Sequence, residues 1–268
     1  HKSDLAPAAI PPSLKEALAS YFVAAAIKDV RRASGALDPV REKYDSCLIN
    51  VSRFTAVQSD LKHPVEEHVE LLWEETRTGY ETGVGYQAVQ NIFKSHYKNV
   101  VGVQESWAQV KAALRNMEQP VVLTVHSKAK EELDYESPTG PKKIIAIGGF
   151  KLSRGLTLDG LVVSYFYRRS LMYDTLMQMA RWFGYRDGYR DLLRLYTTSD
   201  ARKWYWHITQ ASEELKADML ATVGFHRLDR IFSGKDQYGK RKYINLMISK
   251  DDLITIHGCI AAALGMSP

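Results

Sequence analysis

The chain contains few cysteines, no long apolar run and little excess of charge of either sign. Its 268 residues include two cysteines, Cys47 and Cys259, which excludes a disulfide framework and a four-thiolate zinc site. No apolar stretch reaches the roughly 20 residues that a membrane-spanning helix needs, so we expect no such helix and a cytoplasmic protein. The net charge of +5 is compatible with nucleic-acid binding and equally with a solvated, lysine-rich surface.

The chain also lacks the sequence of a complete nucleotide-hydrolysing motor. Residues 83–85 (GVG) and 234–235 (GK) both lack the Gly-Lys-Ser/Thr of a phosphate-binding P-loop. Asp134, Glu136 and Lys142 superficially match a nuclease set of two carboxylates and a lysine, but a Gly-Pro pair interrupts the loop that contains them. No His, Cys and carboxylate spacing indicates a metal site, so we expect none.

Short apolar runs alternate with amphipathic segments, a pattern typical of an α/β protein. The apolar runs predict strands buried on both faces, as in a mostly parallel sheet, at residues 47–51, 121–125, 144–147, 161–166 and 192–197. Helical periodicity predicts helices at residues 14–32, 61–76, 86–97, 106–117, 171–183 and 200–220. Ser13 and Glu16 have the spacing of a capping box at the start of the first helix.

These segments divide the chain into three parts. Residues 1–12 contain three prolines and are predicted to be a linker, and residues 13–224 are predicted to form the α/β domain. The helices near residues 56–117 are interpreted as a helical insertion within that domain. Residues 225–268 form a basic C-terminal extension, in which Gly239 predicts the turn of a hairpin.

Two groups of basic residues are candidates for contacts with nucleic acid. Arg53 lies in a polar loop after the strand at 47–51, where it can reach a phosphate; alternatively, this loop caps the next helix. Lys240, Arg241 and Lys242 lie among aromatic residues of the extension. Their charges can follow phosphates while the rings stack on unpaired bases, but an exposed hairpin with solubilising lysines explains the pattern equally well.

The stretch from Lys142 to Arg194 contains the residues best suited to phosphate chemistry. A glycine-containing loop follows the strand at 144–147, and its candidate residues are Gly149, Ser153, Arg154, Gly155 and Thr157. The helix at 171–183 has Gln178 and Arg181 on one stripe, and Arg186 follows it. Guanidinium groups can neutralise a phosphoryl group in transfer. The plainer interpretation is a pair of strands, a turn and a helix with solvated arginines.

Two segments of this stretch resemble helicase motifs. LSRGLTLDGL resembles motif V, and YDTLMQMARWFGYRDGY resembles motif VI, of superfamily two helicases and translocases. In sequence, the two segments are more similar to one bacterial family, the "Z-one" domain of helicase-like restriction and defence proteins. The domains of this family are labelled as endonucleases. The resemblance implies a RecA-like sheet and the second lobe of a motor. It also implies that ATP and Mg²⁺ are bound mainly by a first, N-terminal lobe of the same parent chain.

The resemblance also implies residue roles. Gln178, Arg181 and Arg186 match the motif VI positions that face the γ-phosphate across the interface between lobes. The two arginines are each displaced by one residue from the usual Gln-x-x-Gly-Arg-x-Gly-Arg spacing, so either can be the arginine finger. Arg154, Gly155 and Thr157 match motif V, which couples the nucleotide state to strand binding.

Three functions are consistent with the sequence. The first is a helicase-type motor lobe that acts on nucleic acid, expected to be DNA. The second is an endonuclease domain, although no convincing metal-binding carboxylate set is present. The third is a scaffold that binds nucleic acid without catalysis.

Overall fold

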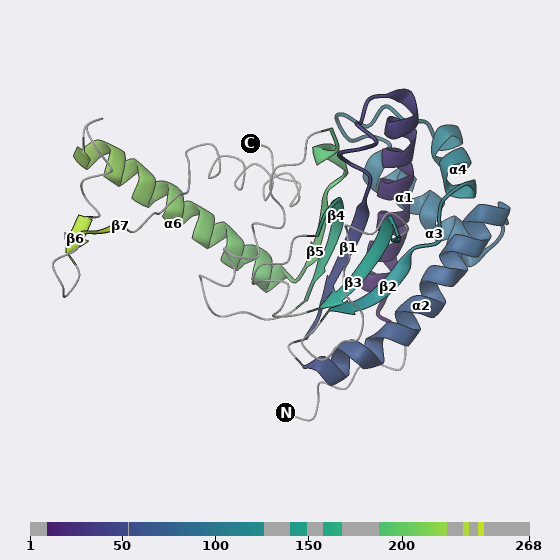
Figure 1. The fold of residues 1–268 in the computed structure, drawn as a ribbon, viewed down its shortest axis with the longest axis horizontal. Coiled ribbons are helices and arrows are strands. Elements are labelled where there is room, and N and C mark those ends of the chain that lie inside the picture. Colours follow the sequence, from purple (N-terminus) through teal and green to yellow (C-terminus); the bar gives the residue numbers. More distant parts are fainter. Residues whose placement is uncertain are drawn as a thin grey trace.

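A five-stranded parallel sheet forms the centre of the fold (Figure 1). The computed structural model describes residues 10–52, 54–125, 140–148, 158–167, 188–223, 233–235 and 241–243. In the order β2-β3-β1-β4-β5, the strands are β2 (Val121–Val125), β3 (Lys143–Gly148), β1 (Asp45–Asn50), β4 (Leu161–Phe166) and β5 (Arg194–Thr197). The predicted α/β class with a parallel sheet flanked by helices is therefore confirmed.

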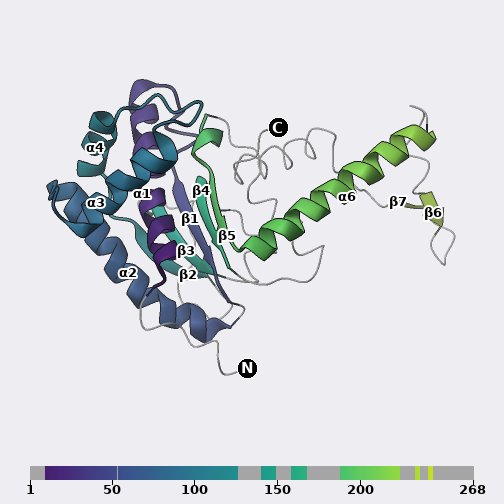
Figure 2. The same cartoon turned by 180° about the vertical axis from the view of Figure 1, so that it is seen from behind.

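Four helices lie together on one face of the sheet (Figures 1 and 2). They are α1 (Pro12–Ser34), α2 (Thr55–Thr78), α3 (Val84–Ile92) and α4 (Trp107–Arg115). A π-helical turn, η1 (Phe93–Tyr97), continues α3, and a 3₁₀ turn, η3 (Arg190–Leu192), precedes β5. None of the helices in the described ranges is long and apolar enough to span a bilayer.

The helix α6 (Ser199–Val223) follows β5 and extends away from the sheet (Figure 1). Beyond its end, β6 (Ser233–Lys235) and β7 (Arg241–Tyr243) pair antiparallel. This pairing confirms the predicted hairpin.

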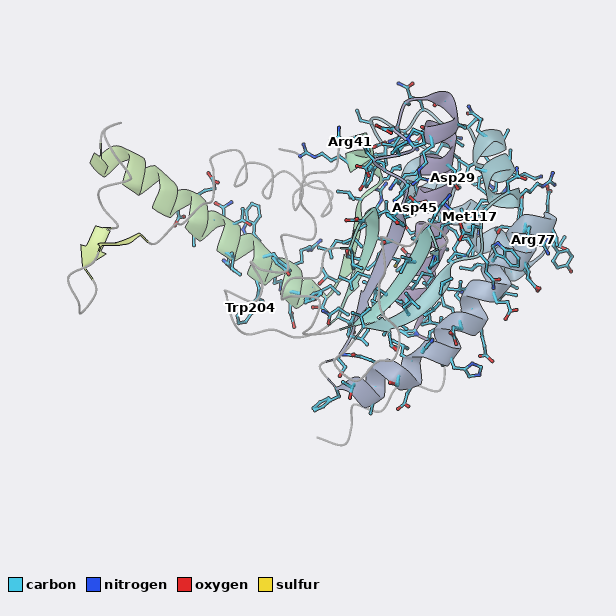
Figure 3. The ribbon with its side chains drawn as sticks, viewed as in Figure 1. Asp29, Arg41, Asp45, Arg77, Met117 and Trp204 are labelled. Carbon is cyan, nitrogen blue, oxygen red and sulfur yellow. The ribbon has the colours of Figure 1, made fainter. Side chains whose placement is uncertain are left out.

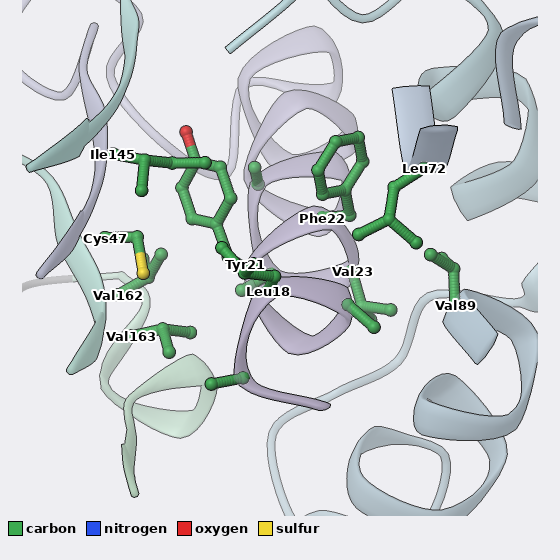
Figure 4. Packing of buried hydrophobic residues seen from close by; sticks show 14 of the residues in the cluster. Leu18, Tyr21, Phe22, Val23, Cys47, Leu72, Val89, Ile145, Val162 and Val163 are labelled. Atoms are coloured by element: carbon green, nitrogen blue, oxygen red, sulfur yellow. The ribbon is translucent and has the colours of Figure 1, made fainter. Parts of the chain in front are cut away.

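The middle of the helix α1, residues 17–28, is buried on all sides, because it lies between the sheet and the outer helices. Figure 4 shows Leu18 and Tyr21 directed toward strand residues that include Cys47, whereas Phe22 and Val23 point toward the outer helices. Five alanines between positions 17 and 26 are each 0 % exposed, so neighbouring backbones approach the helix closely. A helix segment that is apolar all round is a core element of the fold.

The predicted capping box of α1 is wrong. Proline at the first helical position begins the helix, and Pro11 precedes it as a cap without a side-chain hydrogen bond. Ser13 is therefore already inside the first turn, and its hydroxyl shares a 2.9 Å hydrogen bond with the hydroxyl of Tyr165 in β4. This bond ties the start of α1 to the sheet.

The two faces of the sheet differ in what they bury. Successive residues of a strand point to opposite faces, so Cys47 and Ile49 of β1 face the helices and pack in the main core. Leu48 points the other way and belongs to a second, smaller apolar cluster. Asn50, two residues further, lies on the same face as Leu48, and the register aligns it with Phe166 of β4.

A candidate functional site at the carboxyl edge of the sheet

The strand β1 is the point at which the chain reverses its direction across the sheet. The connection after β1 passes through α2, α3 and α4 and leads to β2, whereas the connections after β3 and β4 lead the opposite way. Ligands of open parallel sheets bind outside the carboxyl ends of the strands at such a reversal. The carboxyl end of β1 is therefore the place in this fold where a ligand is expected.

Asn50 is the last residue of β1 and is fully buried. Its backbone oxygen accepts a 2.9 Å hydrogen bond from the amide of Tyr167, but neither polar atom of its side chain has a partner among the described residues. A buried polar group without a partner costs about 1–3 kcal/mol. The side chain of Asn50 therefore offers hydrogen-bonding capacity at the reversal point that no described residue uses.

Thr197, at the end of β5, is a second polar residue of this kind. The register pairs Asn50 with Phe166 and Phe166 with Thr197, so the three side chains point to the same face of the sheet. The hydroxyl of Thr197 is buried and, within the described part of the chain, makes no hydrogen bond. Hydrogen-bonding capacity is thus available at two strand ends of this edge, on either side of a buried phenylalanine.

The loop between β1 and α2 begins with a fixed turn. The hydroxyl of Ser52 accepts a 3.1 Å hydrogen bond from the amide of Phe54, and the backbone oxygen of Ser52 accepts a 2.8 Å bond from the amide group of Gln58. Ser52 therefore shapes the turn before the helix but does not cap it, because Phe54 occupies the cap position without a side-chain hydrogen bond. Arg53 lies outside the described residues.

The opposite, amino edge of the sheet contains a buried ionic cluster that the sequence interpretation missed. Asp45, the first residue of β1, contacts Lys28 at 2.9 Å and Lys143 at 2.7 Å, and Arg32 donates a 3.0 Å bond to it. Asp29 pairs with both Arg32 and Lys143. Figure 3 shows Asp29 and Asp45 close to α1 and the sheet.

Opposing effects determine the pKa of Asp45. Burial raises the pKa of this carboxyl group, but the charges of Lys143, Lys28 and Arg32 outweigh burial and lower the pKa to about 2. Burial lowers the pKa of Lys28 despite its contact with Asp45. Asp45 is therefore ionised at neutral pH, and its contacts join α1, β1 and β3.

A cavity of about 790 Å³ lies beside this cluster, and its polar lining includes Asp29, Arg32, Lys43, Gln109, Lys142 and Lys143. The cations Arg32 and Lys143 on its wall already have carboxylate partners. We therefore interpret the amino edge as a stabilising element and the carboxyl edge as the candidate site.

The comparison with known families agrees with the resemblance of the chain to the Z-one domain. Residues 13–227 match the family model of the Z1 domain. The chain belongs to the Z1 domain family. No curated protein and no solved structure matches it. The matched part of this Z1 domain includes all five strands of the sheet and both segments that resemble helicase motifs.

The predicted site residues of the Z1 domain lie largely outside the described residues. This holds for Gly149, Ser153, Arg154, Gly155 and Thr157, for Gln178, Arg181 and Arg186, and for Lys240. Arg241 and Lys242 belong to β7, but their side chains are outside the described part.

Described residues that flank these segments give their points of attachment to the sheet. The motif V segment, residues 152–161, follows Gly148, the last residue of β3 at the carboxyl edge, and ends at Leu161, the first residue of β4. The motif VI segment, residues 173–189, follows β4 and Tyr167, and its last two residues, Gly188 and Tyr189, are described. The oxygen of Gly188 accepts a 2.8 Å bond from Arg31, which also pairs with Asp191 just ahead of β5. The motif VI segment therefore connects the two edges of the sheet.

Proposed function

We propose that this Z1 domain is the second motor lobe of a helicase-like ATPase that acts on nucleic acid in a bacterial restriction or defence protein. One observation carries the proposal. The strands β3, β1 and β4 are neighbours, and the segments with motif V, Arg53 and motif VI follow their respective carboxyl ends. A parallel sheet brings such ends to one edge, so residues distant in sequence can act on one ligand.

The proposal divides the chemistry between two lobes. ATP and Mg²⁺ bind mainly to a first lobe of the same parent chain, and Arg181 or Arg186, with Gln178, contacts the γ-phosphate across the interface. The motif V loop, including Arg154, relates the nucleotide state to binding of the DNA strand. Within the described ranges, no three His, Cys, Asp or Glu side chains are grouped so that they could hold a metal ion. The proposal therefore gives this lobe an arginine role in nucleotide hydrolysis.

Nucleotide turnover in the full-length parent protein tests the proposal. Replacing an arginine finger lowers phosphoryl-transfer rates by about 10³- to 10⁵-fold, so Arg181→Ala or Arg186→Ala is expected to reduce DNA-stimulated ATP hydrolysis by orders of magnitude. Arg190→Ala is the matched control, because this exposed arginine lies in η3. Wild-type turnover in both finger variants contradicts the proposal. Micromolar affinity of the isolated chain for a fluorescent ATP analogue also contradicts it.

A further inference from the structure

Arg31 is a buried arginine that joins the end of the motif VI segment to the rest of the domain. It lies in the last turns of α1 and is 7 % exposed. Its Nη1 donates a 2.8 Å hydrogen bond to the backbone oxygen of Gly188, and Nη1 and Nη2 donate to the two carboxylate oxygens of Asp191 at 2.8 and 2.6 Å. One side chain thus holds the backbone on both sides of Tyr189, the last residue of the segment.

The same guanidinium group also holds the loop that precedes α4. Nε and Nη2 donate bonds of 2.8 and 3.3 Å to the carboxylate of Glu105, and Nη2 donates a 3.2 Å bond to the oxygen of Gly102. An arginine has five N–H groups, and its contacts with these two residues and with Gly188 and Asp191 occupy all of them. Arg31 therefore has no donor left for a ligand, and an effect of this residue on catalysis has to act through the residues that it holds.

The backbone at Gly188 depends on contacts from other parts of the chain. Its φ is +80°, and a Cβ atom here would lie 2.8 Å from Cδ1 of Leu37, so the position requires glycine. A glycine has no side chain with which to anchor itself. Tyr189, the next residue, is 1 % exposed, and Nζ of Lys28 lies 3.9 Å from the centroid of its ring. Lys28 and Arg31 are three residues apart on one face of α1, so this helix holds the end of the motif VI segment.

The residues proposed to contact the γ-phosphate precede this anchor closely in sequence. Arg186 and Arg181 lie two and seven residues before Gly188. A displacement of a reacting group by about 1 Å can lower a rate by about 100-fold, even when the substituted residue is far from the chemistry. The helix α1 is a rigid support, since it is packed in the main core between the sheet and the outer helices. An anchor on α1 can therefore set where the motif VI arginines meet the nucleotide.

We propose that Arg31 is a positioning residue for ATP hydrolysis, because its bonds to Gly188 and Asp191 fix the end of the motif VI segment on α1. This inference rests on the proposed function, since it assumes that the motif VI arginines act on ATP bound by the first lobe. The bonds to Glu105 and Gly102 hold a different loop and have no part in this role. The two sides of the guanidinium group therefore predict different effects on catalysis.

The substitutions Asp191→Asn and Glu105→Gln in the full-length parent protein test the two sides separately. Each keeps the size of the side chain and removes one carboxylate from Arg31, and the two side chains are similarly buried, at 16 % and 11 % exposed. Asp191→Asn is expected to lower kcat of DNA-stimulated ATP hydrolysis by about tenfold or more, with KM for ATP within about twofold of wild type. Glu105→Gln is the matched control and is expected to leave kcat and KM within about twofold of wild type.

Arg31→Lys provides a second measurement. A lysine keeps the positive charge, but its ammonium group lacks the planar fork that holds Gly188 and both oxygens of Asp191. This variant is expected to lower kcat as Asp191→Asn does. Urea unfolding gives the stability of each variant, and turnover is measured under conditions in which each is folded, so that a loss of folded protein is not counted as a loss of kcat. If Arg31→Lys does not fold, the comparison of Asp191→Asn with Glu105→Gln decides.

The outcomes separate this inference from the proposed function. Wild-type kcat in Asp191→Asn refutes the positioning role and leaves the motor proposal intact. An equal loss of kcat in Glu105→Gln also refutes it, because both substitutions then act only through the general stability of the domain. If the wild-type parent protein shows no DNA-stimulated ATP hydrolysis, the proposed function fails, and the positioning role fails with it.

Discussion

Asp45 is the residue at which a minimal change should have the largest effect on stability. The substitution Asp45→Asn keeps the size of the side chain and removes its charge. Only 1 % of the side chain is exposed, and it is within hydrogen-bonding distance of Lys28, Arg32 and Lys143. The variant therefore tests whether this carboxylate organises the amino edge of the sheet.

The expected magnitude follows from the contacts of the three cations. Arg32 and Lys143 retain Asp29 as a counter-charge in the variant, but no described carboxylate other than Asp45 pairs with Lys28. The Lys28 side chain is 0 % exposed. Lys28 keeps a 2.8 Å hydrogen bond to the oxygen of Tyr44, but removing the carboxylate partner of a buried charge costs about 3–5 kcal/mol. The free energy of unfolding of a typical domain is about 5–15 kcal/mol, so the variant should lose a large share of its stability.

The pH dependence gives a second signature. The pKa of Asp45 is lowered to about 2 from 3.8, so its contribution is complete above pH 3.8 and is lost as the pH falls toward 2. In the variant the pKa of Lys28 should fall further, because burial then acts without Asp45. A lysine whose pKa is lower in the folded than in the unfolded state destabilises the fold while it is charged. This cost decreases as the pH rises and the lysine loses its proton. The variant should therefore recover stability as the pH rises toward 10.5, the usual pKa of lysine.

Urea unfolding followed by circular dichroism, at several pH values, measures both effects. Asp60→Asn is the control, since this exposed aspartate should change stability by less than about 0.5 kcal/mol. A loss below about 1 kcal/mol for Asp45→Asn at pH 7 would refute the reasoning. A loss that does not change up to pH 10 would show that Lys28 is not the group left uncompensated.

Three further substitutions test other parts of the fold. Gly160→Ala should lower the free energy of unfolding in urea by more than about 3 kcal/mol. The reason is that φ is +66° and the new Cβ would lie 1.8 Å from the oxygen of Tyr44. A near-neutral result contradicts the described turn. Ser13→Ala should cost about 1 kcal/mol by the same measurement, through loss of the bond to Tyr165. Burial lowers the pKa of His68 to about 4 from 6.5, so its protonation favours unfolding and the wild type should lose stability as the pH falls from 6.5 to 4. His68→Gln should reduce the change of stability with pH. If stability changes with pH as in the wild type, His68 is not the group responsible.

The strands were predictable because apolar runs between turn residues have few alternative structures. The predicted bounds 121–125 and 161–166 agree with β2 and β4. Helix starts were less predictable. The second helix was predicted from residue 61, near Pro64, but α2 begins at Thr55 and continues through that proline. Gln58 and Leu61 are buried in its first turns, so tertiary packing overrides the local effect of proline.

The ionic cluster could not be predicted from local patterns. Lys28 and Arg32 occur near the end of an amphipathic-looking helix, where cations normally lie in solvent and favour the helix dipole. Their partner Asp45 and its second lysine, Lys143, are 98 residues apart in sequence. Only the parallel pairing of β1 with β3, which places Asp45 opposite Lys143, brings them together.

The two edges of the sheet use polar groups in different ways, and this difference indicates where the molecule can bind a ligand. At the amino edge, buried charges satisfy one another, as Asp45 does with its three cations and Arg31 does with Glu105 and Asp191. At the carboxyl edge, Asn50 and Thr197 lack partners among the described residues, and Tyr167 is exposed. Satisfied groups stabilise the fold, whereas unsatisfied groups reduce its stability unless a ligand or a partner completes them. The amino edge thus stabilises the fold, and the unpaired groups of the carboxyl edge make it the candidate site.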